Sequence, residues 1–356
     1  MWDLRDTGTR GKVGGGWRHA PGELAMHLRA RILVLAMGAL ALASATPALA
    51  QQKYQLDPDT AAKLRDIGPV VKVPEAAKIF LPAQAKAPKD GVKHTDNLSY
   101  GRDPLQKLDV YEPSVHPAQP MPVLIYIHGG GFTRGDKTGR PGNPFYGNLG
   151  YWFGRHGIVV VLANYRLAPK DKWPTGAKDM AGIVAWTHAH IADYGGNAKR
   201  IFLMGESAGA AHVAAYALEK RFQPLAGSGL AGAILFSGLY DPAFETKAAP
   251  SFGMVGPGAP NEAYYGKDTS HYAMHATMRH ITGPKLPVLI IYNEFDPTLM
   301  QVEAGMLFGD LCDRYRDCPK LLWVPGHVHG SAMFTINTPD EWMANRLLDF
   351  IRAPGR

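Results

Sequence analysis

Cysteine and long apolar runs are both scarce in the 356-residue sequence. Its two cysteines exclude a disulfide-stapled miniprotein and a four-cysteine zinc site. The apolar run at residues 32–43 has only twelve residues, whereas a membrane-spanning helix needs about 20. No internal repeat or low-complexity tract occurs, and 46% hydrophobic with 19% charged residues excludes a disordered or fibrous chain. The sequence therefore predicts a globular protein with enough chain for a large core.

The net charge of +7 is in part an N-terminal feature. Six of the 38 basic residues and three of the 31 acidic residues precede Gln51, so residues 51–356 carry a net charge of +4. No cluster of Lys and Arg occurs in that part of the sequence. The charge pattern therefore argues against a nucleic-acid partner.

Residues 26–50 have the pattern of a secretory signal peptide. Met26 opens a short basic stretch, the apolar run follows, and Ala48-Leu49-Ala50 forms a small-x-small cleavage site. A buried core helix is the alternative, but the basic flank and the alanines disfavour it. Residues 1–25 show no structural pattern, and we interpret them as an extension from a start codon assigned too early. We expect an exported protein, periplasmic or secreted, with no membrane span after cleavage.

The two cysteines, Cys312 and Cys318, lie six residues apart. In an oxidising compartment they can form a disulfide that closes a small loop. Two buried free thiols are the alternative, and the sequence does not decide between them.

The order of apolar and amphipathic segments predicts an α/β fold. Residues 51–92 form a mixed N-terminal arm with one expected helix at Pro58–Ile67. Seven apolar, β-rich runs follow from about residue 93, at Lys107–Tyr111, Val123–His128, Ile158–Ala163, Arg200–Gly205, Ala231–Ser237, Leu286–Tyr292 and Leu321–Pro325. Helical patterns occur among them, at Gly147–His156, Gly176–Tyr194, Ala208–Arg221, Leu299–Tyr315 and Asp340–Ile351. This alternation predicts one doubly wound domain at 93–356, with a mostly parallel sheet covered by helices on both faces.

The segment from Tyr240 to Thr282 interrupts the alternation. It is rich in Gly, Pro, Met, His and Tyr and is longer than an ordinary connection. We interpret it as a cap-like excursion over the active-site face, the alternative being a surface loop without a role. Its tyrosines, Tyr264, Tyr265 and Tyr272, can line an aryl pocket or serve in packing.

Ser207 is the candidate nucleophile. It is the central residue of Gly-Glu-Ser-Ala-Gly at 205–209, which follows an apolar strand and precedes a helix of small residues. In this setting the G-x-S-x-G pattern forms a sharp turn that exposes the serine hydroxyl above the sheet edge. The positive end of the helix dipole then lies near the developing oxyanion.

A glycine run supplies the candidate oxyanion hole. The strand at 123–127 ends in His-Gly-Gly-Gly-Phe at 128–132. Backbone N–H groups of Gly129 and Gly130, together with that of Ala208, can point at a ligand oxygen. We expect His128 to brace this loop by hydrogen bonding. A phosphate-binding loop is disfavoured because no G-x-x-x-x-G-K-[ST] pattern follows.

With these motifs the chain resembles the α/β-hydrolase superfamily, in its hormone-sensitive-lipase-like and bacterial feruloyl-esterase-like carboxylesterase branches. The matching motifs run from about residue 95 onward: HGGGF at 128–132, GDK at 135–137, NYRLAP at 164–169, WP at 173–174 followed by Asp179, YGGN at 194–197 and GESAG at 205–209. The resemblance implies an α/β-hydrolase catalytic domain at 93–356, a serine carboxylesterase that needs no metal or organic cofactor. It also implies supporting roles for Gly131 and Glu206. The sequence departs from the family at Glu206, where Asp or His is common, and in the 240–282 excursion.

The triad acid and base follow the serine in the order Ser, Asp, His. Asp296 follows a late strand and matches the family's acid in its position and in the proline after it. Glu294 is the nearby rival, which we expect to brace the loop. His329 precedes a Gly-Ser pair and is the candidate base, and His327 is its rival and otherwise a support of the loop or pocket.

The predicted activity is hydrolysis of short-chain acyl esters, small-molecule substrates, through a Ser207 acyl-enzyme. Three alternatives remain: an arylformamidase or other amide hydrolase, a feruloyl or acetyl-xylan esterase, and a catalytically silent binding module on the same fold. The pair His271 and His275 can bind a metal if it is helical, but no further ligand has a matching spacing. The oligomeric state is not specified by the sequence.

Overall fold

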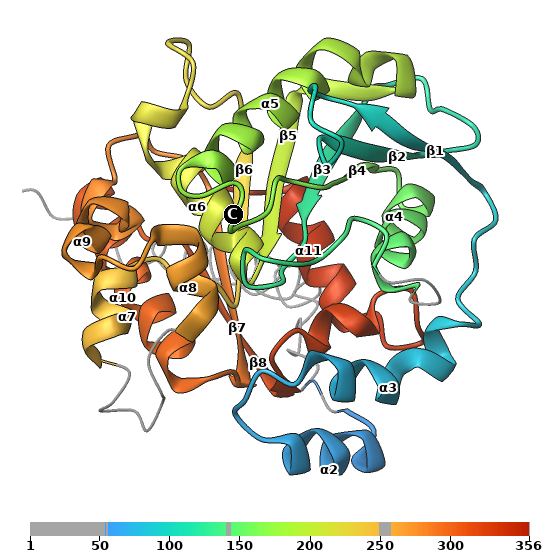
Figure 1. Ribbon diagram of the computed structural model, residues 1–356. Coiled ribbons are helices and arrows are strands. Elements are labelled where there is room, and N and C mark those ends of the chain that lie inside the picture. The colour runs from blue at the N-terminus through green and yellow to red at the C-terminus, as the bar shows by residue number, and fades with distance from the viewer. Residues whose placement is uncertain (1–53, 55, 140–143, 249–257, 356) are drawn as a thin grey trace, which may run out of the picture. The chain divides into compact units, whose positions relative to one another are not determined.

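A twisted eight-stranded sheet forms the centre of the computed structural model, which describes residues 54, 56–139, 144–248 and 258–355 (Figure 1). The expected signal peptide and the extension before it lie outside the described residues. The sheet order is β1-β2-β4-β3-β5-β6-β7-β8, and the pairs β1·β2 and β2·β4 are antiparallel while the others are parallel. The strands are β1 (Val92–Ser99), β2 (Lys107–Pro113), β3 (Met121–Ile127), β4 (Val159–Ala163), β5 (Gly196–Glu206), β6 (Gly232–Phe236), β7 (Val288–Phe295) and β8 (Lys320–Val328).

Both faces of the sheet are buried because the central strands are apolar at nearly every position. Along β3, Val123, Ile125 and Ile127 pack on one side, and Leu124 and Tyr126 pack on the other. Two separate core clusters result, as expected for a parallel sheet between helices. One cluster is covered by α4 (Phe145–Arg155) and α11 (Trp342–Arg352), and the other by α5 (Thr175–His190), α6 (Ala208–Leu218) and α10 (Thr298–Tyr315).

The predicted mostly parallel α/β architecture is confirmed, with two additions in the N-terminal region. The expected helix at Pro58–Ile67 is α2, which Asp57 caps by accepting a hydrogen bond from the Thr60 N–H. The prediction of one helix in the arm is wrong, because α3 (Val73–Gln84) follows it and buries Phe80. Strand β1 was not predicted because it is an edge strand of mostly polar, exposed residues and carries no apolar signal.

Within the 240–282 excursion, the described residues form α7 (Pro242–Ala248), α8 (Gly258–Tyr265), α9 (Tyr272–His275) and short 3₁₀ turns. Helix α8 lies over the glycine loop that follows β3, where Tyr264 stacks on Phe132 with ring centroids 4.5 Å apart. The excursion therefore covers part of the C-terminal edge of the sheet, as the cap-like interpretation expects. No helix within the described ranges is long and apolar enough to cross a membrane.

A disulfide joins Cys312 on α10 to Cys318, which precedes β8. Replacing both cysteines by serine should lower the free energy of unfolding by about 2 kcal/mol, because the bond closes a six-residue loop in the unfolded chain. Urea denaturation monitored by circular dichroism measures the loss. Adding a thiol reductant to the wild type should produce the same loss and leave the double variant unchanged. Equal stability of all four samples would show that the bond does not form.

Candidate active site

Ser207 occupies a strained turn between β5 and α6. Its φ is +55°, a region that side chains other than glycine rarely adopt, and its N–H donates to the Phe236 carbonyl at 2.9 Å. A Cβ on Gly209 would collide with the Ile127 carbonyl of β3, and one on Gly205 would collide with the Gly209 backbone. Glycine is therefore required on both sides of the serine, and the tight approach points the serine away from the sheet.

Three side chains from three strand ends meet above the sheet. Ser207 Oγ lies 3.0 Å from His329 Nε2, and His329 Nδ1 lies 2.8 Å from Asp296 Oδ1. Because the Asp296 carboxylate can only accept, His329 carries its proton on Nδ1, and Nε2 accepts from the serine hydroxyl. His329 and Asp296 are almost completely buried. The residues predicted as nucleophile, acid and base thus form one continuous hydrogen-bonded chain.

The second oxygen of Asp296 is held by groups that the sequence analysis missed. Asp296 Oδ2 accepts from the Ser237 hydroxyl at 2.5 Å and from the Asn293 N–H at 2.6 Å. Ser237 follows β6 with a φ of +49°, and no sequence motif marks it. The rival acid, Glu294, instead accepts from the Gly326 N–H at 2.6 Å, so it braces the loop that carries His329.

His327 faces away from Ser207. Its Nδ1 lies 2.8 Å from Ser331 Oγ and its Nε2 lies 2.7 Å from the Tyr54 hydroxyl. Burial lowers the pKa of His327 to about 3, which keeps its ring neutral. Its geometry is that of a loop support.

The glycine loop presents amide groups next to Ser207. Among the described residues, the N–H groups of Gly130, Gly131 and Ala208 have no acceptor. The Glu206 carboxylate lies against Gly129, whose amide opposes the rise that burial causes in the pKa of Glu206, so this expected oxyanion donor borders a carboxylate. His128 donates from Nδ1 to the Gly129 carbonyl at 2.7 Å, which is the bracing contact expected of it.

Glu206 places a second carboxylate beside the base. Its Oε1 lies 3.5 Å from His329 Nε2, and burial raises the pKa of Glu206. Burial alone would lower the pKa of His329, but its hydrogen bond to Asp296 and the charges of Asp296 and Glu206 outweigh that effect and raise the pKa. The base is therefore more basic than an ordinary histidine.

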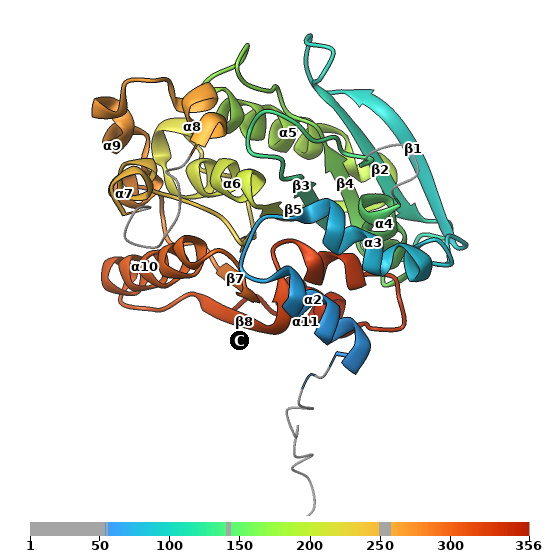
Figure 2. The same ribbon diagram turned by 60° about the horizontal axis from the view of Figure 1, so that its bottom comes forward.

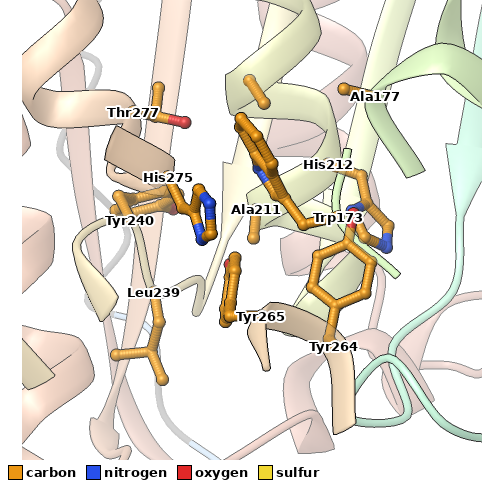
Figure 3. A pocket seen from close by; sticks show the side chains of 11 residues that line it. Trp173, Ala177, Ala211, His212, Leu239, Tyr240, Tyr264, Tyr265, His275 and Thr277 are labelled. Carbon is orange, nitrogen blue, oxygen red and sulfur yellow. The ribbon is translucent and has the colours of Figure 1, made fainter. Parts of the chain in front are cut away.

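A small pocket lies one turn further along α6 from Ser207 (Figure 3). Its volume is about 10 Å³, room for about one water molecule, and neither Ser207 nor His329 lines it. Most of its wall consists of rings, with no carboxylate, lysine or arginine: Trp173, His212, Tyr240, Tyr264, Tyr265 and His275. Phe132, Ala208 and Ala211 pack in one cluster with Tyr264, so this wall continues to the serine. Of the three tyrosines named from the sequence, Tyr264 and Tyr265 line the pocket, and Tyr272 packs beside Tyr265.

The described part of the chain contains no group of three or more His, Cys, Asp or Glu side chains placed to hold a metal ion. His271 pairs with Asp268 at 3.2 Å, and His275 stacks on Trp173 with centroids 4.1 Å apart. The two histidines of the suggested metal pair thus have separate partners.

Known proteins with a similar sequence are enzymes that act on esters or are described by their fold. The profile of a family described as having the α/β hydrolase fold matches residues 124–307. A probable carboxylic ester hydrolase, LipM, of Mycobacterium tuberculosis is 32% identical over 229 residues, 59% of this chain and 51% of that protein. A chlorogenic acid esterase of Aspergillus niger is 38% identical over 122 residues, 31% of this chain and 23% of that protein. The chain thus spans about half or less of these curated relatives.

Solved structures share the fold along most of the chain. A bacterial heroin esterase matches with a TM-score of 0.61 and 26% identity, covering 85% of this chain and 98% of that one. Esterase B from Lactobacillus rhamnosis matches with a TM-score of 0.63 and 20% identity, covering 83% of this chain and 95% of that one. The second likeness, at 20% identity, shows the fold alone.

Substituting His327 and His329 one at a time tests which of them is the catalytic base. His329→Ala should slow the covalent labelling of Ser207 by a fluorophosphonate about 10³-fold or more, because the serine loses its proton acceptor. His327→Ala should slow labelling only on the order of tenfold, because it loosens the loop without removing the acceptor. Intact-mass spectrometry gives both rates. Near-normal labelling of His329→Ala with an inert His327→Ala would reverse the assignment.

The raised pKa of His329 also predicts how the rate of Ser207 labelling depends on pH. Labelling requires neutral His329, so its rate should fall as the pH drops through a pKa above the ordinary value for histidine. Glu206→Gln removes a negative charge 3.5 Å from Nε2 and should move that acid limb to lower pH. Glu75→Gln, the same change at an exposed site on α3, is the matched control. An acid limb that stays in place or moves upward in Glu206→Gln would contradict this electrostatic account.

Proposed function

Since the chain belongs to the α/β-hydrolase fold family, we propose that it is a serine carboxylesterase that hydrolyses short-chain acyl esters. One observation carries the proposal: the chain of hydrogen bonds from Asp296 through His329 to Ser207, next to glycine-loop amides that have no acceptor among the described residues. Fold membership alone does not fix the reaction. The hydrogen-bonded chain does so because each member has the partner that nucleophilic catalysis requires.

The mechanism follows from the positions of the protons. His329 Nε2 takes the Ser207 proton as Oγ attacks the ester carbonyl, and Asp296 stabilises the resulting imidazolium through Nδ1–H. The oxyanion forms beside the amides of Gly130 and Ala208, and the loss of one such donor typically costs about 3 kcal/mol of barrier. The imidazolium then protonates the departing alcohol. Water attacks the acyl-enzyme by the same proton route in reverse and releases the acid.

Gly129, the third predicted donor, lies against the Glu206 carboxylate. The Gly131 amide, which has no acceptor among the described residues, is the alternative third donor. Its φ of +60° is compatible with glycine and strains other residues.

The ring-lined wall beside α6 and the similar proteins both bear on the size and chemical class of the substrate. The ring-lined wall that continues from Tyr264 to Ala208 borders the serine, which favours a short acyl group. It offers no cation or carboxylate to bind a charged group, which favours neutral esters. The names of the relatives, carboxylic ester hydrolase, chlorogenic acid esterase and heroin esterase, support the ester class.

We also propose that the protein is exported. The signal-peptide pattern at residues 26–50 supports this proposal, and the Cys312–Cys318 disulfide suits an oxidising compartment.

The proposed activity is tested with nitrophenyl esters of increasing acyl length. The wild type should hydrolyse acetyl and butyryl esters faster than octanoyl esters, and Ser207→Ala should lower kcat by about 10⁴-fold or more. Ser114→Ala, the same change at an exposed position after β2, is the control. No turnover of any ester, or undiminished turnover by Ser207→Ala, would refute the proposal. Faster turnover of a formanilide than of the matching ester would favour the amide-hydrolase alternative.

A further inference from the structure

The loop that carries His329 is held from outside the sheet by the N-terminal arm. Helix α2 packs on β8, and α3 packs on the 3₁₀ turn at Ser331–Thr335 (Figure 2). On α3, the Gln84 side chain donates from Nε2 to the carbonyls of Phe334 and Ile336, each at 2.7 Å. The arm thus satisfies backbone groups of the segment that follows the proposed base.

Tyr54, at the start of the described chain, reaches the same loop by its hydroxyl. That oxygen lies 2.7 Å from His327 Nε2 and 2.8 Å from Asp340 Oδ2. The Tyr54 ring also stacks on Trp342, with centroids 4.5 Å apart, and on His327 at 5.8 Å. Residues 273 positions apart in the sequence are therefore joined next to His329.

The donors and acceptors of this network have one consistent order. The Asp340 carboxylate accepts, so the Tyr54 hydroxyl donates to it and its oxygen accepts from His327 Nε2–H. His327 Nδ1 is then an acceptor and receives the Ser331 hydroxyl proton at 2.8 Å. The Ser331 oxygen in turn accepts the Val328 N–H at 3.0 Å.

We propose that Tyr54 is a positioning residue for the catalytic base, which it aligns through His327 and Ser331. The inference rests on the proposed function of Ser207 and His329. Val328 and Gly330 flank His329 on both sides, and Val328 is the backbone end of the network. Without the Tyr54 oxygen, the His327 Nε2–H is buried with no acceptor, and the loop must move to find one. Such a movement turns His329 away from Ser207.

The test is Tyr54→Phe in the full-length protein, because phenylalanine keeps the stacked ring and removes only the hydroxyl. We expect kcat for an aryl acetate to fall on the order of tenfold with KM nearly unchanged, and fluorophosphonate labelling of Ser207 to slow by a similar factor. We also expect the acid limb of the pH–rate profile to move to lower pH. The hydrogen bond to Asp296 raises the pKa of His329, so loosening that bond should lower this pKa relative to the wild type. A merely structural role would not move that limb.

Tyr315→Phe is the matched control. It removes a hydroxyl that donates to the Gly283 carbonyl at 2.8 Å, at the far end of α10 from the site. It should leave kcat, labelling and the pH profile as in the wild type.

Ser331→Ala removes the other end of the same network and serves as the second variant. It should reproduce the defects of Tyr54→Phe, and the double variant should be little worse than either, since both act through His327. The proposal would be overturned if the losses in kcat of the two single variants multiplied in the double variant. It would also be overturned if the wild type were active and the folded Tyr54→Phe variant had an unchanged kcat and an unchanged acid limb. A wild type that neither turns over esters nor labels at Ser207 would instead refute the proposed function.

Discussion

The hydrogen bond between His329 Nδ1 and Asp296 is the interaction on which the site depends. It fixes the tautomer that leaves Nε2 as an acceptor, points that atom at Ser207, and raises the pKa of His329 against the opposing effect of burial. Both partners are almost completely buried, so water does not screen the charge of the carboxylate. The same burial makes loss of this hydrogen bond costly in free energy, because a displaced partner would leave a desolvated charge unpaired.

Much of the surrounding structure serves to hold the two ends of that bond. Ser237 and Asn293 fix the Asp296 carboxylate, and Glu294 fixes the start of the His329 loop at Gly326. The far side of the loop rests on the N-terminal arm through Tyr54 and Gln84. Apart from the Asn293 backbone amide, each of these groups is a polar side chain with a specific partner, so the loops around the site are ordered by hydrogen bonds as well as by apolar packing.

The features predictable from the sequence are those with a local signal. The apolar strands and the glycines around Ser207 can be predicted from the sequence. Burial of a strand and close approach of the backbone at a glycine each depend on only a few neighbouring residues. Strand β1 gave no such signal because an exposed edge strand needs no apolar residues. Helix α3 contains Pro82, a residue that usually ends or kinks a helix, so its helical signal was weak. Ser237 and Tyr54 act on partners 59 and 273 residues away, a distance at which no spacing rule applies.

Rapid-quench mass spectrometry of the enzyme mixed with an aryl acetate tests most directly whether Ser207 forms an acyl-enzyme. We expect a burst of the phenol that approaches one equivalent per active site, with an acetyl group on the peptide that contains Ser207. The hydroxyl groups between Arg200 and Lys220 belong to Ser207 and Tyr216, so fragmentation of that tryptic peptide can place the acetyl group on Ser207 Oγ. Phenol release with no covalent intermediate, or an acetyl group bound to a different residue, would contradict the account.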